Sequence, residues 1–225
     1  SYFHHPAKGT LKIAGRAFMF ILEQLHQGLH LKSFTLFKTQ EFCDLNSQPL
    51  WNNTQVFLGD VKNMYTNLPH SQLKTTISWV LKHATQHFAN KKVAVPNDKS
   101  KKPFWQQGTK IPQRAKVISF KKLKTTLLAN INNIYFQVGS LLVKQTQGIP
   151  MGSPCSPALA IALCLKCEHH FLLANPSMPI KGFRFMDDLL VFGTSKSVLD
   201  SLHGLYPSPL EIEEEIVLPN QPFRF

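Results

Sequence analysis

The chain has 225 residues, of which 43% are hydrophobic, so it can bury a real core as one domain or as two closely packed subdomains. This composition excludes disorder as the default state. There are 25 Lys and Arg against 13 Asp and Glu, which gives a net charge of +12. Eleven of the basic residues lie between Lys91 and Lys124, where Asp98 is the single acid. A field of this size attracts a polyanion, most commonly nucleic acid; an acidic membrane surface and a solvated lysine-rich loop are the alternatives.

The first expected element is a helix over residues 16–31, because apolar residues recur there at helical spacing. The sequence TQVFLGDV, residues 54–61, predicts a short central strand covered on both faces and ending at Asp60. After a turn at TNLPHS, apolar positions fall on one face and predict a helix over residues 71–88.

The basic stretch 91–124 contains three prolines and interleaved aromatic residues, so we expect an extended or partly ordered insertion. Two β-rich runs around Gly139-Ser140 predict a hairpin, since Gly supplies the positive φ that a tight turn needs. The sequence QGIPMGSPCSP then leads into an expected helix over residues 157–174, with Ser156 as N-cap and Pro157 as first helical residue. This helix is apolar nearly all round, and we expect it to be buried.

The run FRFMDDLLVF, residues 183–192, places Asp187 and Asp188 side by side between apolar residues. It predicts a strand, a turn and a second strand, with both carboxylates at the tip. A buried ionised carboxylate costs several kcal/mol unless it is paired, hydrogen-bonded or bound to a cation, so a positive group should lie opposite. Ordinary turn chemistry is the alternative. The sequence LEIEEEIVL, residues 210–218, predicts a last strand.

The four cysteines are too few and too unevenly spaced for a disulfide framework, which indicates a reducing compartment. Cys164 and Cys167 form a C-x-x-C inside a helical pattern, so we interpret them as buried helix cysteines rather than zinc ligands. No apolar stretch reaches the roughly 20 clean residues of a membrane helix, so no spanning segment is expected. The chain opens on Ser1 and stops at QPFRF without terminal punctuation, so we expect a fragment.

If the strand ending in Asp60 and the Asp-Asp hairpin meet at one sheet edge, their carboxylates suit a pair of divalent metals about 3.5–4 Å apart. Such a pair serves phosphoryl transfer, and Mg²⁺ prefers oxygen ligands.

Three motifs then resemble those of reverse transcriptases, in that family's order. FLGDVKNMYTNLPH resembles the first palm motif, QGIPMGSPCSPALA the loop and helix that hold nucleotide and template, and FMDDLLVF the metal-binding hairpin. Within this family the chain is most similar to Penelope-like elements, with telomerase as a near relative. The similarity rests on YTNLPH, on the hairpin before QGIPMGSP, and on SFTLFKTQEF at residues 33–42.

The resemblance implies an α+β polymerase palm, in which an antiparallel sheet is backed by the helices 71–88 and 157–174. Residues 1–55 would form partial fingers, and residues 56–225 the palm with its basic insertion 91–124. The family continues into a primer grip and thumb about where this chain ends, so we expect both to be missing.

The resemblance also implies the site. Asp60 and Asp187 would be the principal metal ligands with the Val61 carbonyl, and Asp188 the weaker or structural carboxylate. Tyr65 would lie under the sugar of the incoming nucleotide. The nucleotide pocket would further include Gln147, Gly148 and Arg16, with Lys8 and Lys12 as weaker candidates. Template and primer contacts are expected from Gly152, Ser153, Pro154, Phe185, Met186, Lys99, Lys101 and Lys102.

The implied activity is that of an RNA-directed DNA polymerase from a retroelement, which uses two Mg²⁺ ions, or Mn²⁺ in their place. Its partners would be an RNA template, a DNA primer and deoxynucleoside triphosphates, inside the cell and in the nucleus at the site of action. The alternatives are a non-catalytic nucleic-acid-binding remnant and a telomerase-like reverse transcriptase.

Overall fold

The computed structural model describes residues 7–28, 30–38, 40–42, 55–110 and 112–214. Its contacts divide the chain into two compact units. The helical unit consists of the described residues up to His30 together with Leu68–Leu163, and the sheet unit of those in Leu31–Asn67 and from Cys164 on. The expected division into fingers, residues 1–55, and palm, residues 56–225, is a functional one and stays a prediction.

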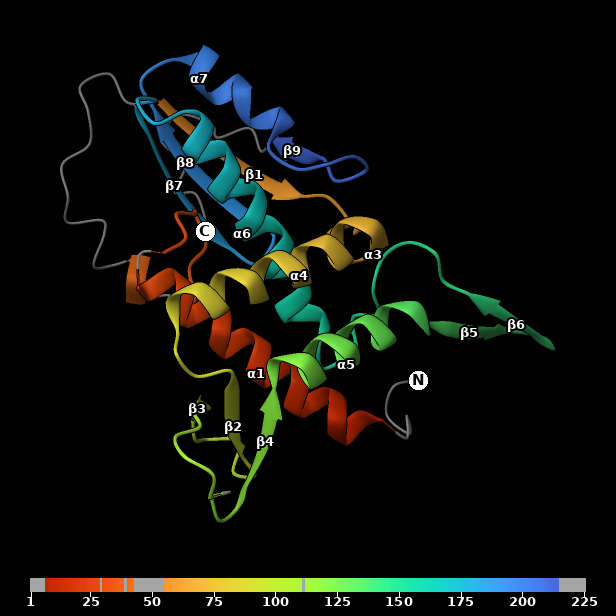
Figure 1. Cartoon of the computed structure of the whole chain (residues 1–225). Coiled ribbons are helices and arrows are strands. Elements are labelled where there is room, and N and C mark those ends of the chain that lie inside the picture. Colours follow the sequence, from red (N-terminus) through yellow and green to blue (C-terminus); the bar gives the residue numbers. More distant parts are fainter. Residues whose placement is uncertain (1–6, 29, 39, 43–54, 111, 215–225) are drawn as a thin grey trace. The chain divides into compact units, whose positions relative to one another are not determined.

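Three helices pack against one another in the helical unit (Figure 1). They are α1 Lys8–Gln27, α4 His70–His87 and α5 Phe120–Asn132. The predicted helix 71–88 is confirmed as α4 within one residue at each end. The predicted helix 16–31 was wrong at both ends, because Leu11 and Ala14 extend the buried face of α1 toward the N-terminus and Gly28 follows its last residue.

The basic stretch 91–124 is ordered, which corrects the expectation of a partly ordered insertion. Here β2 Lys92–Pro96 lies between β3 Phe104–Trp105 and β4 Ala115–Ser119 in an antiparallel sheet. The middle of β2 is buried, and the Trp105 ring packs edge-on against Phe20 of α1 with 5.1 Å between centroids. Apolar residues between the lysines therefore anchor this sheet to the helices.

Helix α5, at the end of the basic stretch, was not expected from the sequence. Its N-cap is Ser119, whose hydroxyl accepts a hydrogen bond from the Lys122 amide at 3.3 Å. Leu123, Leu127 and Ile131 recur every four residues and are fully buried. This helical signal is present in the sequence, but the lysines and prolines around it masked the pattern.

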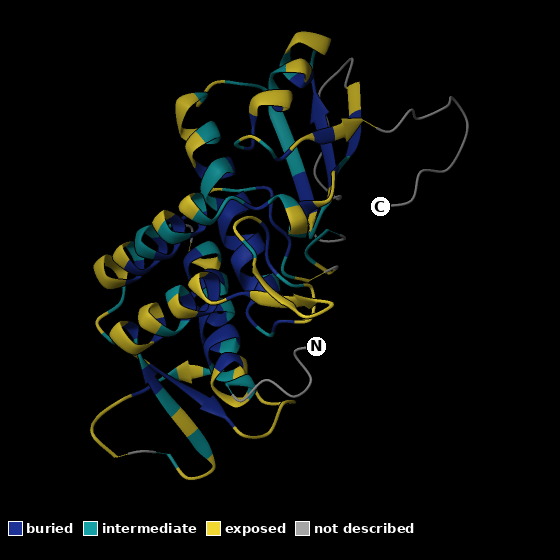
Figure 2. Ribbon diagram, turned by 90° about the vertical axis from the view of Figure 1, so that its right-hand side faces the viewer, coloured by how far each residue is buried: buried dark blue, intermediate teal, exposed yellow. Residues whose placement is uncertain are grey.

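The hairpin predicted around Gly139-Ser140 is confirmed. Strands β5 Tyr135–Val138 and β6 Leu141–Lys144 pair antiparallel, and Gly139 has the positive φ of +61° that the turn needs. All residues of both strands are exposed, as the yellow ribbon of this hairpin in Figure 2 shows.

The predicted helix 157–174 is confirmed as α6 Ser156–Ala174, which begins in the helical unit and ends in the sheet unit. Its residues 158–165 are all buried, as expected. Ser156 is the first helical residue rather than the N-cap, because the Leu159 amide bonds to the Cys155 carbonyl at 3.0 Å. Among the described helices α6 alone is long and apolar enough to cross a membrane, but 56% of its apolar window is buried in the protein, as in an ordinary core helix.

The sheet unit contains an antiparallel sheet of order β7-β8-β1-β9 (Figure 1), which confirms the expected palm-like sheet. Its strands are β1 Gln55–Val61, β7 Ile180–Phe185, β8 Asp188–Gly193 and β9 Ile212–Glu214. Consecutive residues of β1 are buried, as expected for a central strand with both faces covered. Strand β9 lies within the strand predicted at 210–218, but it begins only at Ile212; the predicted residues 215–218 lie outside the described residues.

Short helices complete the sheet unit and were not predicted. They are α3 Met64–Asn67 after β1, and α7 Lys196–Asp200 with the 3₁₀ turn η2 Ser201–Gly204 after β8. Of the two helices expected behind the sheet, α6 contributes residues from Cys164 on to the same unit, whereas α4 belongs to the helical unit.

The segment 33–37 lies along β7, the outer strand of this sheet. The Arg184 amide donates to the Phe34 carbonyl at 2.6 Å, and the Leu36 amide donates to the Arg184 carbonyl at 2.8 Å. This parallel bridge between Thr35 and Arg184 places part of SFTLFKTQEF directly beside the hairpin that carries the Asp-Asp pair.

Candidate active site

The first palm-like motif and the Asp-Asp hairpin meet at one end of the antiparallel sheet. Asp60 on β1 lies opposite Asp188 on β8, and Asp188 lies opposite Phe185 on β7. The Val61 amide donates to the Asp187 carbonyl at 3.0 Å. Asp60 therefore lies at the same sheet end as Asp187 and Asp188, although more than a hundred positions separate it from them in the sequence.

The carboxylates are not deeply buried, which corrects the expectation drawn from their apolar neighbours. Asp60 and Asp187 are half-buried and Asp188 is exposed. Asp187 shares a two-residue turn with Met186, and Asp188 is the first residue of β8. Water can therefore reach this hairpin tip, and the cost of burying an ion there is smaller than the sequence indicated.

Asp60 and Asp188 face each other across an antiparallel ladder, where opposed side chains lie on the same side with Cβ atoms about 4.5–5.5 Å apart. Two negative charges in this arrangement repel each other. In the part of the chain that the structure describes, no group of three or more His, Cys, Asp and Glu side chains is arranged to hold a metal ion. The ligand set inferred from the motifs is smaller: the carboxylates of Asp60 and Asp187 and the Val61 carbonyl. It consists of oxygen atoms only, which fits Mg²⁺.

Tyr65 lies on α3, directly after β1, and is half-buried. Its phenol pKa is raised above 10.0, first by burial and then by the negative charge of Asp187. The ring therefore lies within electrostatic reach of the candidate metal ligand, and it is not a fully buried core side chain.

Phe185 and Met186 precede the candidate ligand on the same hairpin. Phe185 is 37% exposed, and Met186 has a φ of +59° in the left-handed region. A non-glycine residue in that region costs about 1 kcal/mol or more, so its surroundings must hold it there.

In the helical unit, Gln147 and Gly148 are fixed against the start of α4. Gln147 forms a β-bridge with Pro69, and the Gly148 amide donates to the Leu68 carbonyl at 2.9 Å. His70 Nε2 lies 2.6 Å from the Gly148 carbonyl oxygen, and Gly148 has a φ of +75°. The loop expected to line the nucleotide pocket is thus pinned by backbone contacts, and Gly148 has a conformation that favours glycine.

Gly152, Ser153 and Pro154 form the turn that leads into α6. Gly152 is exposed, whereas Ser153 is buried and its amide donates to the Pro150 carbonyl at 3.0 Å. Pro154 touches Gly15 of α1 so closely that a Cβ on Gly15 would lie only 3.0 Å from the Pro154 carbonyl carbon. The turn expected to face the template is therefore packed tightly onto α1.

Arg16 holds the loop after β2. Its guanidinium donates to the carbonyls of Pro96 at 2.6 Å, Asp98 at 3.3 Å and Lys101 at 2.6 Å. Arg16 also lines a cavity of about 550 Å³ together with Lys12 and Lys99. Its observed contacts are structural, and its role toward a triphosphate stays a prediction, as does that of Lys8.

The three lysines expected to contact template or primer are on the same loop and are exposed. The Lys102 ammonium lies 3.1 Å from a Glu23 carboxylate oxygen of α1. Asp98 accepts hydrogen bonds from the amide and hydroxyl of Ser100 at 3.0 and 2.8 Å. The loop that presents Lys99, Lys101 and Lys102 is thereby ordered rather than merely solvated.

Comparison with protein-family models and with curated protein sequences gives no match. Solved structures of telomerase do match. Apo telomerase of Candida tropicalis aligns with 85% of this chain at a TM-score of 0.59 and 17% identity, and 33% of its own length is covered. Telomerase of Candida tropicalis in complex with a fragment of telomeric RNA aligns with 87% at 0.60 and 18% identity, and that of Candida albicans with 87% at 0.56 and 12% identity.

The chain has a telomerase-like reverse-transcriptase fold. It spans about a third of the length of the telomerase chains that it matches. At this level of identity the likeness shows the fold, and it agrees with the α+β palm implied by the motifs.

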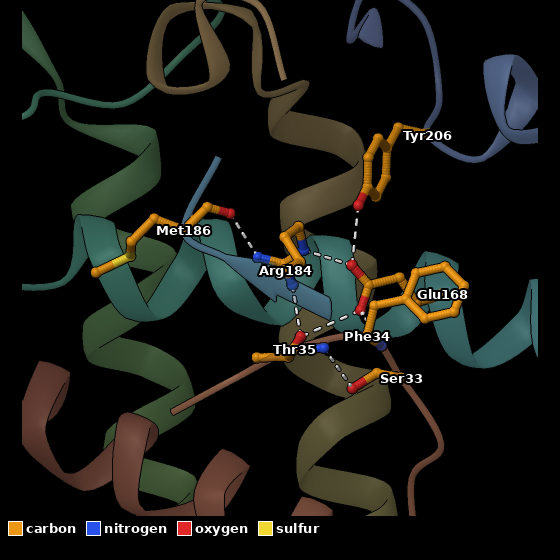
Figure 3. Close-up of polar contacts among 7 residues, drawn as sticks. All are labelled: Ser33, Phe34, Thr35, Glu168, Arg184, Met186 and Tyr206. Carbon is orange, nitrogen blue, oxygen red and sulfur yellow. Dashed lines mark hydrogen bonds and ion pairs between the residues drawn. The ribbon is translucent and has the colours of Figure 1, made fainter. Parts of the chain in front are cut away.

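Sequence reasoning missed a buried polar network that joins β7 of the hairpin to α6 in this reverse-transcriptase fold (Figure 3). Arg184 of β7 is fully buried and forms an ion pair with Glu168 of α6, which is also fully buried. Burial by itself lowers the pKa of Arg184, but the charge of Glu168, the neighbouring Cys164 and Tyr206, and the hydrogen bond to Glu168 together outweigh burial and raise that pKa. Burial, followed by the charge of Glu168, also raises the pKa of Tyr206.

The sequence contains a weak signal for this network. Glu168 stands in a helix that is otherwise apolar nearly all round, and Arg184 alternates with apolar residues in FRFMDD. Buried charges survive only when they are paired, so the two residues predict one another in principle. The sequence alone did not indicate which charges were buried.

Proposed function

We propose that this chain is part of an RNA-directed DNA polymerase of a retroelement, which adds deoxynucleotides to a primer 3′-hydroxyl. The observation that carries the proposal is the strand pairing that puts Asp60 opposite Asp188, together with the hydrogen bond from Val61 to Asp187. The reverse-transcriptase fold supports it independently. The YTNLPH motif supports a relation to Penelope-like elements, whose site of action would be the nucleus.

In this proposal Asp60, Asp187 and the Val61 carbonyl would hold two Mg²⁺ ions, or Mn²⁺ in their place. Metal ions bound there would supply activation of the primer hydroxyl and stabilisation of the leaving pyrophosphate. Asp188 remains the weaker carboxylate, which shapes the hairpin end opposite Asp60. Tyr65 presents its ring near Asp187 and excludes a 2′-hydroxyl from the nucleotide site.

The remaining residues bind the substrates. Gln147, Gly148 and Arg16 would contact the incoming nucleotide, and the turn 152–154 with Phe185 and Met186 would contact template and primer. The exposed lysines of the loop after β2 would bind phosphates. Telomerase of Candida tropicalis was solved with a fragment of telomeric RNA, which supports RNA as a partner.

A second candidate is a nucleic-acid-binding remnant without polymerase activity. The specific observation in its favour is coverage, because the chain spans only about a third of the matched telomerases. A telomerase-like reverse transcriptase is the other alternative, favoured by the matched structures themselves.

Primer extension on an RNA template with Mg²⁺ tests the proposal. We expect Asp187→Asn to lower the extension rate by about a hundredfold or more, because it removes a principal ligand, while RNA affinity stays nearly unchanged. Asp200→Asn, an exposed position on α7, is the matched control and should extend normally. Undiminished extension by Asp187→Asn would overturn the site, and RNA binding without extension by the unaltered chain would favour the remnant.

A further inference from the structure

The turn that carries Asp187 accepts a hydrogen bond from one buried cation, the guanidinium of Arg184. The side chain of Arg184 is fully buried, and its Nη1 donates to the Met186 carbonyl at 2.6 Å (Figure 3). The next carbonyl, that of Asp187, accepts from the Val61 amide at 3.0 Å. Two successive carbonyls of the turn are thus fixed from two different strands.

The rest of the guanidinium is fixed as well. Its Nε donates to Glu168, and its Nη2 donates to the Thr35 hydroxyl at 2.5 Å. Because the guanidinium is a planar, rigid fork, bonds to Glu168 and Thr35 also determine where Nη1 points. The position of the Met186 carbonyl therefore depends on residues of α6 and of the segment 33–37.

Glu168 is held by further donors. Its Oε2 accepts from the Phe34 amide at 3.0 Å and from the Thr35 hydroxyl at 3.1 Å, and its Oε1 accepts from the Tyr206 hydroxyl at 2.9 Å. The buried carboxylate thus meets the requirement for several hydrogen bonds. Each of the three guanidinium nitrogens thus donates to a named acceptor, which leaves the guanidinium little freedom to turn.

Stability alone explains this network poorly. Replacing a buried ion pair by neutral residues of similar size is often neutral or stabilising, because desolvation offsets the attraction between the charges. Met186, in contrast, has a left-handed backbone that its surroundings must hold in place. A buried arginine whose guanidinium donates to the Met186 carbonyl can hold that turn.

We propose that Arg184 is a positioning residue, which fixes the Met186–Asp187 turn and so orients the Asp187 carboxylate beside Asp60. Glu168, Thr35 and Tyr206 hold its guanidinium in the required orientation. The consequence for catalysis rests on the proposed polymerase function, but the effect on the turn does not.

The decisive variant is the double substitution Arg184→Met with Glu168→Gln. It removes both charges together, so it avoids an unpaired buried charge. The new amide oxygen can take the place of Oε2 and accept from the Phe34 amide, and the new NH₂ group can take the place of Oε1 and donate to the Tyr206 hydroxyl. Tyr206→Phe is the milder variant, because it removes one hydrogen bond to Glu168. Leu199→Ala is the matched control: this buried side chain packs on Gly193, at the end of β8 far from the turn.

The primary measurement is hydrogen exchange of individual backbone amides, which requires no enzymatic activity. In the double variant, exchange of the Val61 amide should rise about tenfold, while amides in the middle of β8 keep their protection. Tyr206→Phe should show a smaller rise at the same amide. Leu199→Ala should spare Val61 and affect the opposite end of the sheet.

Primer extension adds the functional measurement. The double variant should lower kcat by roughly tenfold to a hundredfold, with RNA affinity unchanged, because misplacement of a catalytic group by about 1 Å has an effect of this size. Unchanged exchange at Val61, or an equal rise at all sheet amides, would overturn the positioning role. A local rise at Val61 in a chain that never extends a primer would support the positioning role and refute the polymerase function.

Discussion

A methyl group added at Gly15 should separate α1 from the turn before α6. A Cβ there would overlap the Pro154 carbonyl oxygen and would lie 3.0 Å from the carbonyl carbon and 3.3 Å from the Cys155 Cα. These are backbone atoms, which cannot rotate away as the end of a side chain can. Overpacking of this kind costs about 1–3 kcal/mol, whereas Ala gains about 0.5–1 kcal/mol over Gly inside a helix. We therefore expect Gly15→Ala to lower the free energy of unfolding by about 1–2 kcal/mol.

Gly9→Ala is the matched control on the same helix. A Cβ at Gly9 would meet no atom within 4 Å, so only the gain in helix propensity, up to about 1 kcal/mol, remains. Urea unfolding followed by circular dichroism should thus shift the midpoint down for Gly15→Ala and leave it unchanged or slightly higher for Gly9→Ala. Wild-type stability in Gly15→Ala would refute the close contact between α1 and the Pro154 turn.

Three further outcomes follow from the structure. Tyr65→Val should raise ribonucleotide over deoxynucleotide incorporation about tenfold, or about 1.4 kcal/mol of differential barrier, in competition assays; equal loss of both with a lower melting temperature would instead make the ring structural. Exchanging Lys99 and Lys101 for Gln should flatten the salt dependence of RNA binding by about 0.7–0.9 per lost phosphate contact, whereas the exposed control Lys82→Gln on α4 should not. Burial raises the pKa of Cys155 to about 12, so its thiol stays protonated when folded but ionises near 9.0 when unfolded. The free energy of unfolding should then fall with rising pH between these values, by up to about 1.4 kcal/mol per pH unit for this thiol, and Cys155→Ala under reducing conditions should lessen that fall.

Elements with one clear periodicity could be predicted from the sequence. The helices α4 and α6 and the hairpins around Gly139 and Met186 show a local pattern that packing then reinforces. The basic stretch could not be predicted in the same way. Its strands are short, and what orders them is contact with α1, through Trp105 against Phe20 and through Arg16 on the loop carbonyls. Such contacts join residues about 80 positions apart, which no local pattern encodes.

In the candidate site, too, local motifs could be predicted from the sequence, whereas burial in the folded chain could not. The meeting of Asp60 with the Asp-Asp hairpin followed from motif order, because each motif is short and its chemistry is visible in its residue types. The exposure of Asp188 was predicted wrongly, because apolar neighbours in the sequence say nothing about where a hairpin tip ends relative to the sheet.

The sequence predicted buried carboxylates at Asp187 and Asp188, whereas the buried charges in the structure are those of other residues. An ionised group was expected to be buried among the apolar residues of FRFMDDLLVF, with a partner of opposite sign facing it. Such a pair exists, but it consists of Arg184, two positions before the turn, and Glu168 of α6, and both are fully buried. Because the fully buried charges are those of Arg184 and Glu168, Asp187 stays half-buried and Asp188 exposed, while Arg184 and Val61 hold the carbonyls of Met186 and Asp187 by hydrogen bonds. Under the proposed metal-binding role, a carboxylate that exchanges ligands would benefit from this separation, since its own burial would resist each change of charge.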